Sequence, residues 1–200
     1  MRPQEQQRDD VQAERAAFAD WMRTVDPARV KVLDESGLVR GMRLGYGYSE
    51  RGERCFDTAP LSRGKRLSLV GWIGLDGSGC VATQASTINQ PLFRGFVLKH
   101  LLPTLRPGDF VVWDNHRIHD AEGLREQIEA GGARVVPLPR YSPDLSPIEP
   151  MWSKLKHVVR KLRADTTEAL EQAVEVAVSL VTGEDARGWF EHCGFCLQSD

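Results

Sequence analysis

The sequence lacks any hydrophobic run of the length that a membrane-spanning helix needs, which is about 18 apolar residues or more. Its N-terminal stretch, MRPQEQQRDD, contains no apolar segment that could form the core of a secretion signal. We therefore expect a cytoplasmic protein with no membrane partner. The net charge of −2 is unlike the basic balance of a free-standing DNA-binding domain, so DNA binding would depend on a local basic patch.

Cysteine is also scarce: the 4 cysteines among 200 residues are too few for a disulfide scaffold. Cys193 and Cys196 form a C-x-x-C pair beside His192, and such a pair can ligate zinc. A second ligand pair at zinc-site spacing is missing, as is the strand-to-helix context of a redox-active pair. We therefore interpret these two cysteines as small buried thiols at the end of a helix.

The length and the 41% of hydrophobic residues suit one domain with a sizeable core. The pattern predicts an amphipathic helix over 4–25 and an irregular strand pair over 40–60. The remaining strands come first and then alternate with helices, which is typical of a mixed α/β domain. We expect these strands at 30–33, 66–75, 81–86, 110–113 and 135–138, and helices at 89–105, at 121–130, from about 147, at 166–181 and at 184–192.

Two aspartates share one local context. Asp34 follows the apolar run VKVL, and Asp114 follows the apolar run FVVW. We expect each aspartate just past the C-terminal end of a buried strand, where open α/β sheets place their binding residues. An aspartate after a strand can instead merely turn the chain. A simple turn would explain either aspartate alone, but it explains less well why both follow a four-residue apolar run.

A third acid, Glu149, follows the proline-rich run PRYSPDLSP and opens a predicted helix. The pattern Ser146-x-x-Glu149, with Pro147 at the first helical position, also matches a capping box. In that interpretation Glu149 would only satisfy backbone donors at the helix end.

The helical wheel gives Glu149 a second interpretation. At about 100° per residue, three basic residues fall on its side of the helix: Lys156, Arg160 and Arg163. A separate apolar stripe would face the core and consists of Trp152, Leu155, Val159 and Leu162. The basic face suits a phosphate-bearing substrate, and a solvated charged face is the alternative.

Carboxylates on rigid elements suit a divalent metal site. Attack on a phosphodiester needs an activated nucleophile and a stabilised leaving oxygen, and two divalent ions about 4 Å apart can supply both. Mg²⁺ prefers hard oxygen ligands and keeps several waters, so a few carboxylates suffice. We therefore interpret Asp34, Asp114 and Glu149 as the catalytic acids of a metal-dependent site that cuts or joins DNA.

These acids lie in motifs that resemble the DDE transposases of bacterial insertion sequences related to mariner. The motifs are LDESG from Leu33 to Gly37, VWDN from Val112 to Asn115 with His119, and YSPDLSPIE from Tyr141 to Glu149 with Trp152 and Lys156. The 34 residues between Asp114 and Glu149 match the spacing typical of that group. The resemblance extends from about residue 28 to at least residue 163, and YSPDLSPIE is its most specific part.

The resemblance implies an RNase H-like fold, in which helices flank a mixed five-stranded sheet. It also implies Mg²⁺-dependent hydrolysis at transposon ends and strand transfer by the freed 3′-hydroxyl, usually into TA dinucleotides. The metal ligands would be Asp34, Asp114 and Glu149, with Mg²⁺ or Mn²⁺ bound and two ions present when DNA is bound. Asn115 and His119 would have supporting roles. Glu35 also matches the family, as a neighbour of the site rather than a ligand.

Members of this family normally carry helix-turn-helix segments before the catalytic domain, but here the first aspartate is already residue 34. We therefore expect the catalytic portion: an N-terminal amphipathic helix (1–27), an RNase H-like DDE domain (28–165), and C-terminal helices packed on that domain (166–200). Double-stranded DNA would be the partner of a homo-oligomer that needs a separate or missing DNA-binding region. The residues expected to contact DNA are Lys156, Arg160, Arg163 and Arg140.

Two other functions stay open beside that of a transposase. A catalytically silent remnant or regulator would keep the fold and pair with an intact transposase; the missing DNA-binding region favours it, and the presence of all three acids opposes it. Another RNase H-like nuclease would act on hybrids or junctions, and the YSPDLSPIE run opposes it.

Overall fold

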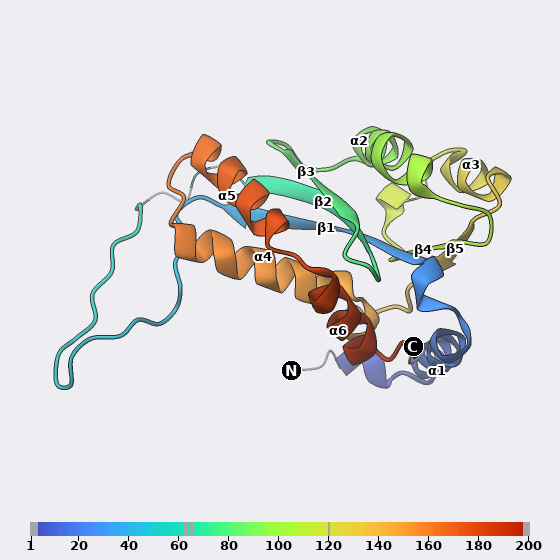
Figure 1. Ribbon diagram of the computed structural model, residues 1–200, viewed down its shortest axis with the longest axis horizontal. Coiled ribbons are helices and arrows are strands. Elements are labelled where there is room, and N and C mark those ends of the chain that lie inside the picture. Colours follow the sequence, from blue (N-terminus) through green and yellow to red (C-terminus); the bar gives the residue numbers. More distant parts are fainter. Residues whose placement is uncertain (1–3, 62–63, 65, 120, 198–200) are drawn as a thin grey trace.

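The computed structural model describes residues 4–61, 64, 66–119 and 121–197, so residues 1–3 and 198–200 of the predicted terminal segments lie outside it. The described chain folds around one five-stranded sheet with the strand order β3-β2-β1-β4-β5 (Figure 1). β1 pairs antiparallel with β2 and parallel with β4, which makes the sheet mixed. The strands are β1 (Val30–Val39), β2 (Arg66–Gly74), β3 (Gly79–Gln84), β4 (Phe110–Trp113) and β5 (Arg134–Pro137).

Helices cover both faces of the sheet. They are α1 (Asp9–Thr24), α2 (Gln90–Phe96), α3 (Leu124–Ala130), α4 (Ile148–Leu162), α5 (Thr167–Ser179) and α6 (Gly183–Cys193). The helix predicted over 89–105 is interrupted after α2 by a π-helical segment, Val97–Leu101, and a 3-10 turn, Leu102–Thr104. Pro103 lies in that turn and has no amide hydrogen with which to continue an α-helical ladder. None of the described helices is long and apolar enough to span a membrane.

Alternation along β1 divides the core between the two faces. Val32 and Leu38 point toward the layer that contains α4, α5 and α6, and they share a core cluster with the buried stripe of α4. Leu33 points the other way, into a second cluster with Phe93 of α2 and other side chains of the α2 and α3 layer. The predicted fold class, a mixed five-stranded sheet flanked by helices, is confirmed.

The terminal helices belong to the same core as the centre of the chain. Phe18 and Met22 of α1 and Phe190 of α6 lie in the cluster formed by α4 and the sheet. Trp21 of α1 also packs against Phe195, with ring centroids 6.1 Å apart. The N-terminal and C-terminal segments therefore help to bury the face of the sheet that carries α4.

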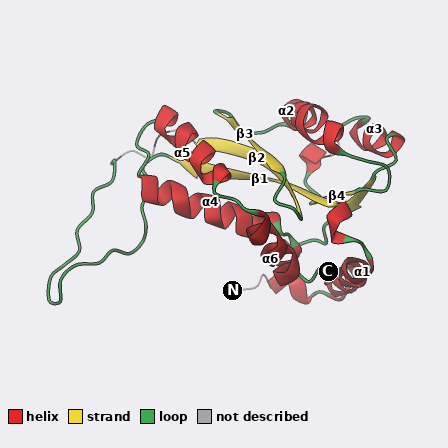
Figure 2. Ribbon diagram, in the orientation of Figure 1, coloured by secondary structure: helices red, strands yellow, loops and turns green. Residues whose placement is uncertain are grey.

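One predicted element is wrong. The segment 40–60, expected as a strand pair, contains no strand and projects from the sheet as a long loop (Figure 2). We call residues 41–61 the arm. Its large side chains are not buried, since Tyr48 is 93% exposed and Phe56 is 85% exposed. Without a layer to bury one face, the segment has no packing to stabilise a ladder.

Candidate active site

Asp34 lies within β1 and not after it, because β1 continues from Val30 to Val39 and the expected end at residue 33 is wrong. The pairing of β1 with β2 continues past Asp34 as far as Val39 and Arg66, and this keeps the strand regular. Strand alternation places Asp34 on the face covered by α4. There the indole Nε1 of Trp152 donates a hydrogen bond to Oδ2 of Asp34 at 3.0 Å.

The strand opposite Asp34 leaves room for that indole. Asp34 pairs in register with Gly71 of β2. A Cβ atom at Gly71 would lie 2.8 Å from Cη2 of Trp152 and 3.0 Å from the carbonyl oxygen of Cys80. Because Trp152 is buried and well packed, this glycine permits the close approach of α4 to the sheet beside Asp34.

Asp114 follows β4 directly, as the sequence predicts, and its side chain is 49% exposed. Its Oδ1 accepts a hydrogen bond from the amide of His116 at 2.9 Å. The ring of His119 returns to the same residue, with Nδ1 at 3.0 Å from Oδ1 and at 2.7 Å from the backbone oxygen. Burial would raise the pKa of Asp114, but the hydrogen bonds from His119 and the His116 amide lower it below its usual value.

His119 is a buried bridge between two carboxylates. Its Nε2 lies 3.0 Å from Oε1 of Glu35, and its ring packs against Phe93 with centroids 4.4 Å apart. Burial alone would lower the pKa of His119, but the contacts with Asp114 and Glu35 raise it to about 10. A charged imidazolium therefore joins Glu35 of β1 to Asp114 after β4. His119 thus lies in direct contact with Asp114, and its supporting role there stays a prediction.

Glu149 lies in the first turn of α4 and is exposed. The capping-box alternative does not apply, because Pro147 occupies the N-cap position and no side chain caps this helix. Within the described part of the chain, the Glu149 carboxylate accepts no hydrogen bond from another residue. Its charge therefore remains available to a cation or to the other acids.

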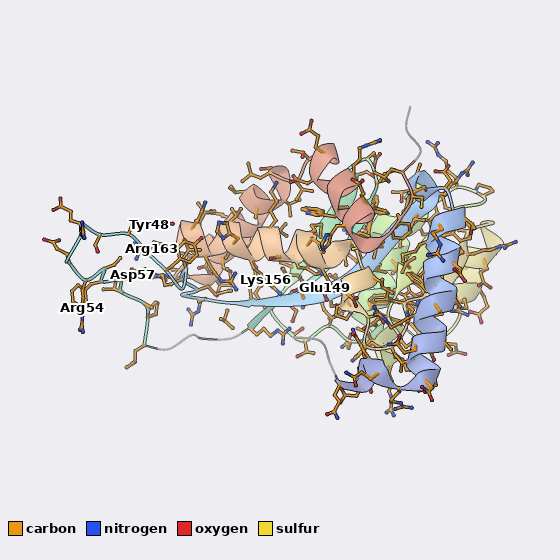
Figure 3. All side chains as sticks on the ribbon, turned by 90° about the horizontal axis from the view of Figure 1, so that it is seen from below. Tyr48, Arg54, Asp57, Glu149, Lys156 and Arg163 are labelled. Atoms are coloured by element: carbon orange, nitrogen blue, oxygen red, sulfur yellow. The ribbon has the colours of Figure 1, made fainter. Side chains whose placement is uncertain are left out.

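The three acids line one cleft of about 400 Å³ (Figure 3 labels Glu149). Burial first, and then the negative charges of Glu35 and Glu149, together raise the pKa of Asp34 to about 7. Asp34 is therefore a carboxyl group that shares its surroundings with other acids. Repulsion of this kind is what a bound cation relieves.

The chemistry of these donors fits a hard divalent cation, since all three are carboxylates. Within the described ranges, however, no group of three or more acidic, histidine or cysteine side chains has the spacing of a metal site. The three acids therefore line one cleft, but they are not close enough together to hold one metal ion.

The two cysteines near the C-terminus differ in exposure. Cys193 is buried at the end of α6 as expected, whereas Cys196 is exposed, so the interpretation of both as buried thiols is wrong for Cys196.

Asn115 extends the hydrogen bonding between β4 and β5 beside the cleft. Its Nδ2 donates to the carbonyl oxygen of Leu138 at 3.1 Å, and the amide of Leu138 donates to Trp113 at 2.7 Å. These bonds extend the pairing of β4 and β5 beyond the strand ends. They fix the backbone after β4, where Asp114 lies, to the backbone that leads into the proline-rich loop.

The four basic residues predicted to contact DNA have different surroundings. Lys156 and Arg160 are partly exposed on α4, and neither pairs with a carboxylate in the part of the chain that the structure describes. Figure 3 shows Glu149, Lys156 and Arg163 in order along α4 toward the arm, where Arg163 forms an ion pair with Asp57.

The fourth basic residue, Arg140, lines the acid-lined cleft. Its guanidinium is held by two acids of α1, Asp10 at 2.8 Å and Glu14 at 2.7 Å. No local pattern indicates this partnership, because Arg140 is separated from Glu14 by 126 positions and from Asp10 by 130. On α4, the expected core stripe is confirmed for Trp152, Leu155 and Val159, but Leu162 is exposed because the helix ends there.

Fold and cleft together define an RNase H-like α/β domain with a carboxylate-lined site on its central strands. Residues 29–171 match the family model described as DDE superfamily endonuclease, and the chain belongs to that family. No curated protein sequence matches the chain. The resemblance to mariner-related transposases is confirmed by this match and by the solved structures of similar fold.

Three of those structures indicate how much of a transposase the chain corresponds to. The Mos1 transposase paired-end complex with left transposon end is 18% identical with a TM-score of 0.71, and the match covers 97% of this chain and 60% of that chain. The Mos1 strand transfer complex is 20% identical with a TM-score of 0.69, covering 92% and 57%. The catalytic domain of Mos1 mariner transposase is 15% identical with a TM-score of 0.66, covering 97% and 91%. This chain therefore spans about 60% of the length of the longer transposase chain.

Proposed function

We propose that this chain is the catalytic portion of a transposase, which cuts DNA strands at transposon ends and joins the freed ends to a target. The observation that carries the proposal is the convergence of Asp34, Asp114 and Glu149 on one cleft, within the segment that matches the DDE endonucleases. Mos1 structures with a transposon end and in a strand transfer complex share the fold and support a DNA substrate. A TA target and a homo-oligomeric active form extend the proposal.

The three acids would hold Mg²⁺ or Mn²⁺, and Mos1 complexes with each of these metals support that choice. When bound, these ions, two in the presence of DNA, would supply positive charge at the attacking and leaving oxygens. The side chains around the acids orient them. Trp152 holds one oxygen of Asp34, and His119 holds one oxygen of Asp114.

Binding of the DNA backbone would depend on the free basic residues of α4. Lys156 and Arg160 lie on the helix that carries Glu149 and have no carboxylate partner among the described residues. They could therefore contact phosphates without first breaking an ion pair. To contact a phosphate, Arg163 would first have to release Asp57. Arg140 would have to release Asp10 and Glu14.

A catalytically silent partner of an intact transposase is the second candidate function. The absence of a preformed three-ligand group in the described residues favours it. In that case the protein would keep the fold and the basic face of α4 without binding metal in the cleft.

Thermal unfolding against Mn²⁺ and Mg²⁺, followed by a nicking assay on duplex DNA, tests the first candidate against the second. Metal should raise the Tm of the wild type, because binding to the folded state alone stabilises it. Asp114→Asn should lose that response and all nicking. Asp20→Asn, a carboxylate of α1 outside the cleft, is the matched control and should behave like the wild type. A wild type that neither responds to metal nor nicks DNA would favour the silent partner, and preference for an RNA–DNA hybrid would indicate another nuclease.

A further inference from the structure

Two side chains near the N-terminus hold the loop that joins β5 to α4. Gln6 is buried, and its Nε2 donates to the carbonyl oxygen of Tyr141 at 2.5 Å and to Oδ1 of Asp144 at 3.3 Å. Arg15 of α1 donates to both carboxylate oxygens of Asp144, at 2.9 and 2.7 Å, in a bidentate ion pair. Both side chains precede residue 29, where the match to the DDE endonucleases begins. A segment outside the family match thus contacts its most specific motif.

The loop needs such support because its backbone is strained. Tyr141 has φ 57°, in the left-handed region that residues with a side chain seldom adopt. A conformation of this kind persists only where the surrounding structure holds it. Gln6 provides one contact at the carbonyl of Tyr141 itself, and the hydroxyl of Ser142 provides another by donating to the carbonyl of Arg140. Part of what fixes the loop therefore comes from the N-terminal segment.

The same loop forms one wall of the acid-lined cleft. Residues 140–143 line the cleft together with the three acids. The chain then enters α4, where the amide of Glu149 donates to the carbonyl of Ser146 at 3.1 Å. Asp34, in contrast, is fixed by the sheet. A change in the loop would therefore move the start of α4, and Glu149 with it, relative to Asp34.

We propose that Gln6 and Arg15 are positioning residues of the active site, which hold this loop in the conformation that keeps Glu149 at the cleft with Asp34 and Asp114. Neither side chain lines the cleft, so both act through Tyr141 and Asp144. The effect on DNA cleavage rests on the proposed function, whereas the effect on the loop does not.

The polar contacts can be removed without undocking α1. The helix is anchored by three apolar side chains that are buried in the structure: Val11, Phe18 and Met22. Burial of these groups is the main source of its packing energy, and replacement of Arg15 leaves it in place although the Arg15 side chain is itself only 16% exposed. Replacement of Arg15 should therefore release the loop while α1 stays in place.

The test compares Gln6→Ala and Arg15→Ala with the wild type and with Arg23→Ala, which removes an arginine of the same helix whose ion pair among the described residues is with Asp20 of α1. A charge-swap pair, Arg15→Asp with Asp144→Arg, checks that the ion pair and not the arginine matters. Hydrogen exchange over residues 138–146, the rise in Tm with Mn²⁺, and kcat and KM for nicking are measured. The first readout does not depend on activity.

We expect Gln6→Ala and Arg15→Ala to exchange roughly tenfold faster in the loop and to respond less to Mn²⁺. Their kcat should fall roughly 10- to 100-fold with KM nearly unchanged, because misplacement of a reacting group acts on the chemical step. Arg23→Ala should match the wild type. The charge-swap pair should restore most of the Mn²⁺ response and kcat that Arg15→Asp or Asp144→Arg alone loses. A loop that loosens with no change in Mn²⁺ response or kcat would overturn the inference. If no form nicks DNA but Arg15→Ala still weakens the Mn²⁺ response, the inference stands and the transposase proposal fails.

Discussion

Trp152 and Asp34 join α4 to the central strand by a hydrogen bond of 3.0 Å between the indole Nε1 and a carboxylate oxygen. Trp152→Phe keeps an aromatic ring but removes this donor and leaves a small cavity. We expect a loss of about 1–2 kcal/mol in the free energy of unfolding. Because the hydrogen bond lowers the pKa of Asp34, the variant should also need a higher pH for the same Mn²⁺ stabilisation. Denaturant unfolding and metal titrations at several pH values test both, with Trp189→Phe as the control.

The raised pKa of Asp34 predicts a pH dependence of stability in the metal-free protein. The folded state keeps the proton of Asp34 up to about pH 7, whereas the unfolded state releases it near the usual 3.8. The free energy of unfolding should therefore fall as the pH rises between these values and level off above them. Asp34→Asn should lack this fall and be more stable than the wild type at pH 8, by roughly 2–4 kcal/mol. Equal stability of the two proteins at pH 8 would contradict the prediction.

The raised pKa of His119 predicts a second pH dependence of stability, at higher pH than that of Asp34. Its folded-state pKa of about 10 exceeds the usual 6.5, so its stabilisation is complete below pH 6.5 and is lost as the pH rises to about 10. His119→Gln should be less stable than the wild type near pH 6 by roughly 3 kcal/mol, because Glu35 and Asp114 lose a buried charged partner. The difference should shrink toward pH 10. Unfolding curves of His119→Gln and of the exposed control His116→Gln across this range would test it.

The basic face of α4 predicts a change in the salt dependence of DNA binding. Lys156→Ala and Arg160→Ala should each weaken binding to all duplex sequences alike and reduce the slope of log K against log salt by about 0.9. Lys161→Ala is the matched control, because Lys161 is an exposed cation of the same helix on another side. A slope that stays the same in both test variants would place this face in solvent.

Local patterns in the sequence were enough to predict most of the sheet, the place of Asp114 directly after β4 and the place of Glu149 in the first turn of α4. The run FVVW predicts β4 with its observed bounds, because four buried apolar residues between turn signals have few alternatives. The run VKVL predicts only the start of β1. Its continuation through Asp34 and Glu35 depends on pairing with β2, a contact between distant residues that no local pattern contains.

The side-chain partnerships of the site were harder to predict for the same reason. Trp152 fits the apolar stripe of its helix, and the pattern does not reveal that its indole nitrogen reaches Asp34. The bridge from Glu35 to His119 spans 84 residues, and the ion pair from Arg15 to Asp144 spans 129. Such contacts depend on tertiary packing, which sequence periodicity does not encode.

The arm leaves and re-enters the sheet at one place, since Val39 and Arg66 are partners in the ladder between β1 and β2. The register of the two strands is therefore independent of how many residues lie between them. Mutation can lengthen, shorten or rewrite the arm while Asp34 keeps its side of the sheet. An insertion of a single residue within β1 would turn Asp34 to the opposite face. Evolution thus has wide freedom in the arm and almost none a few residues before it.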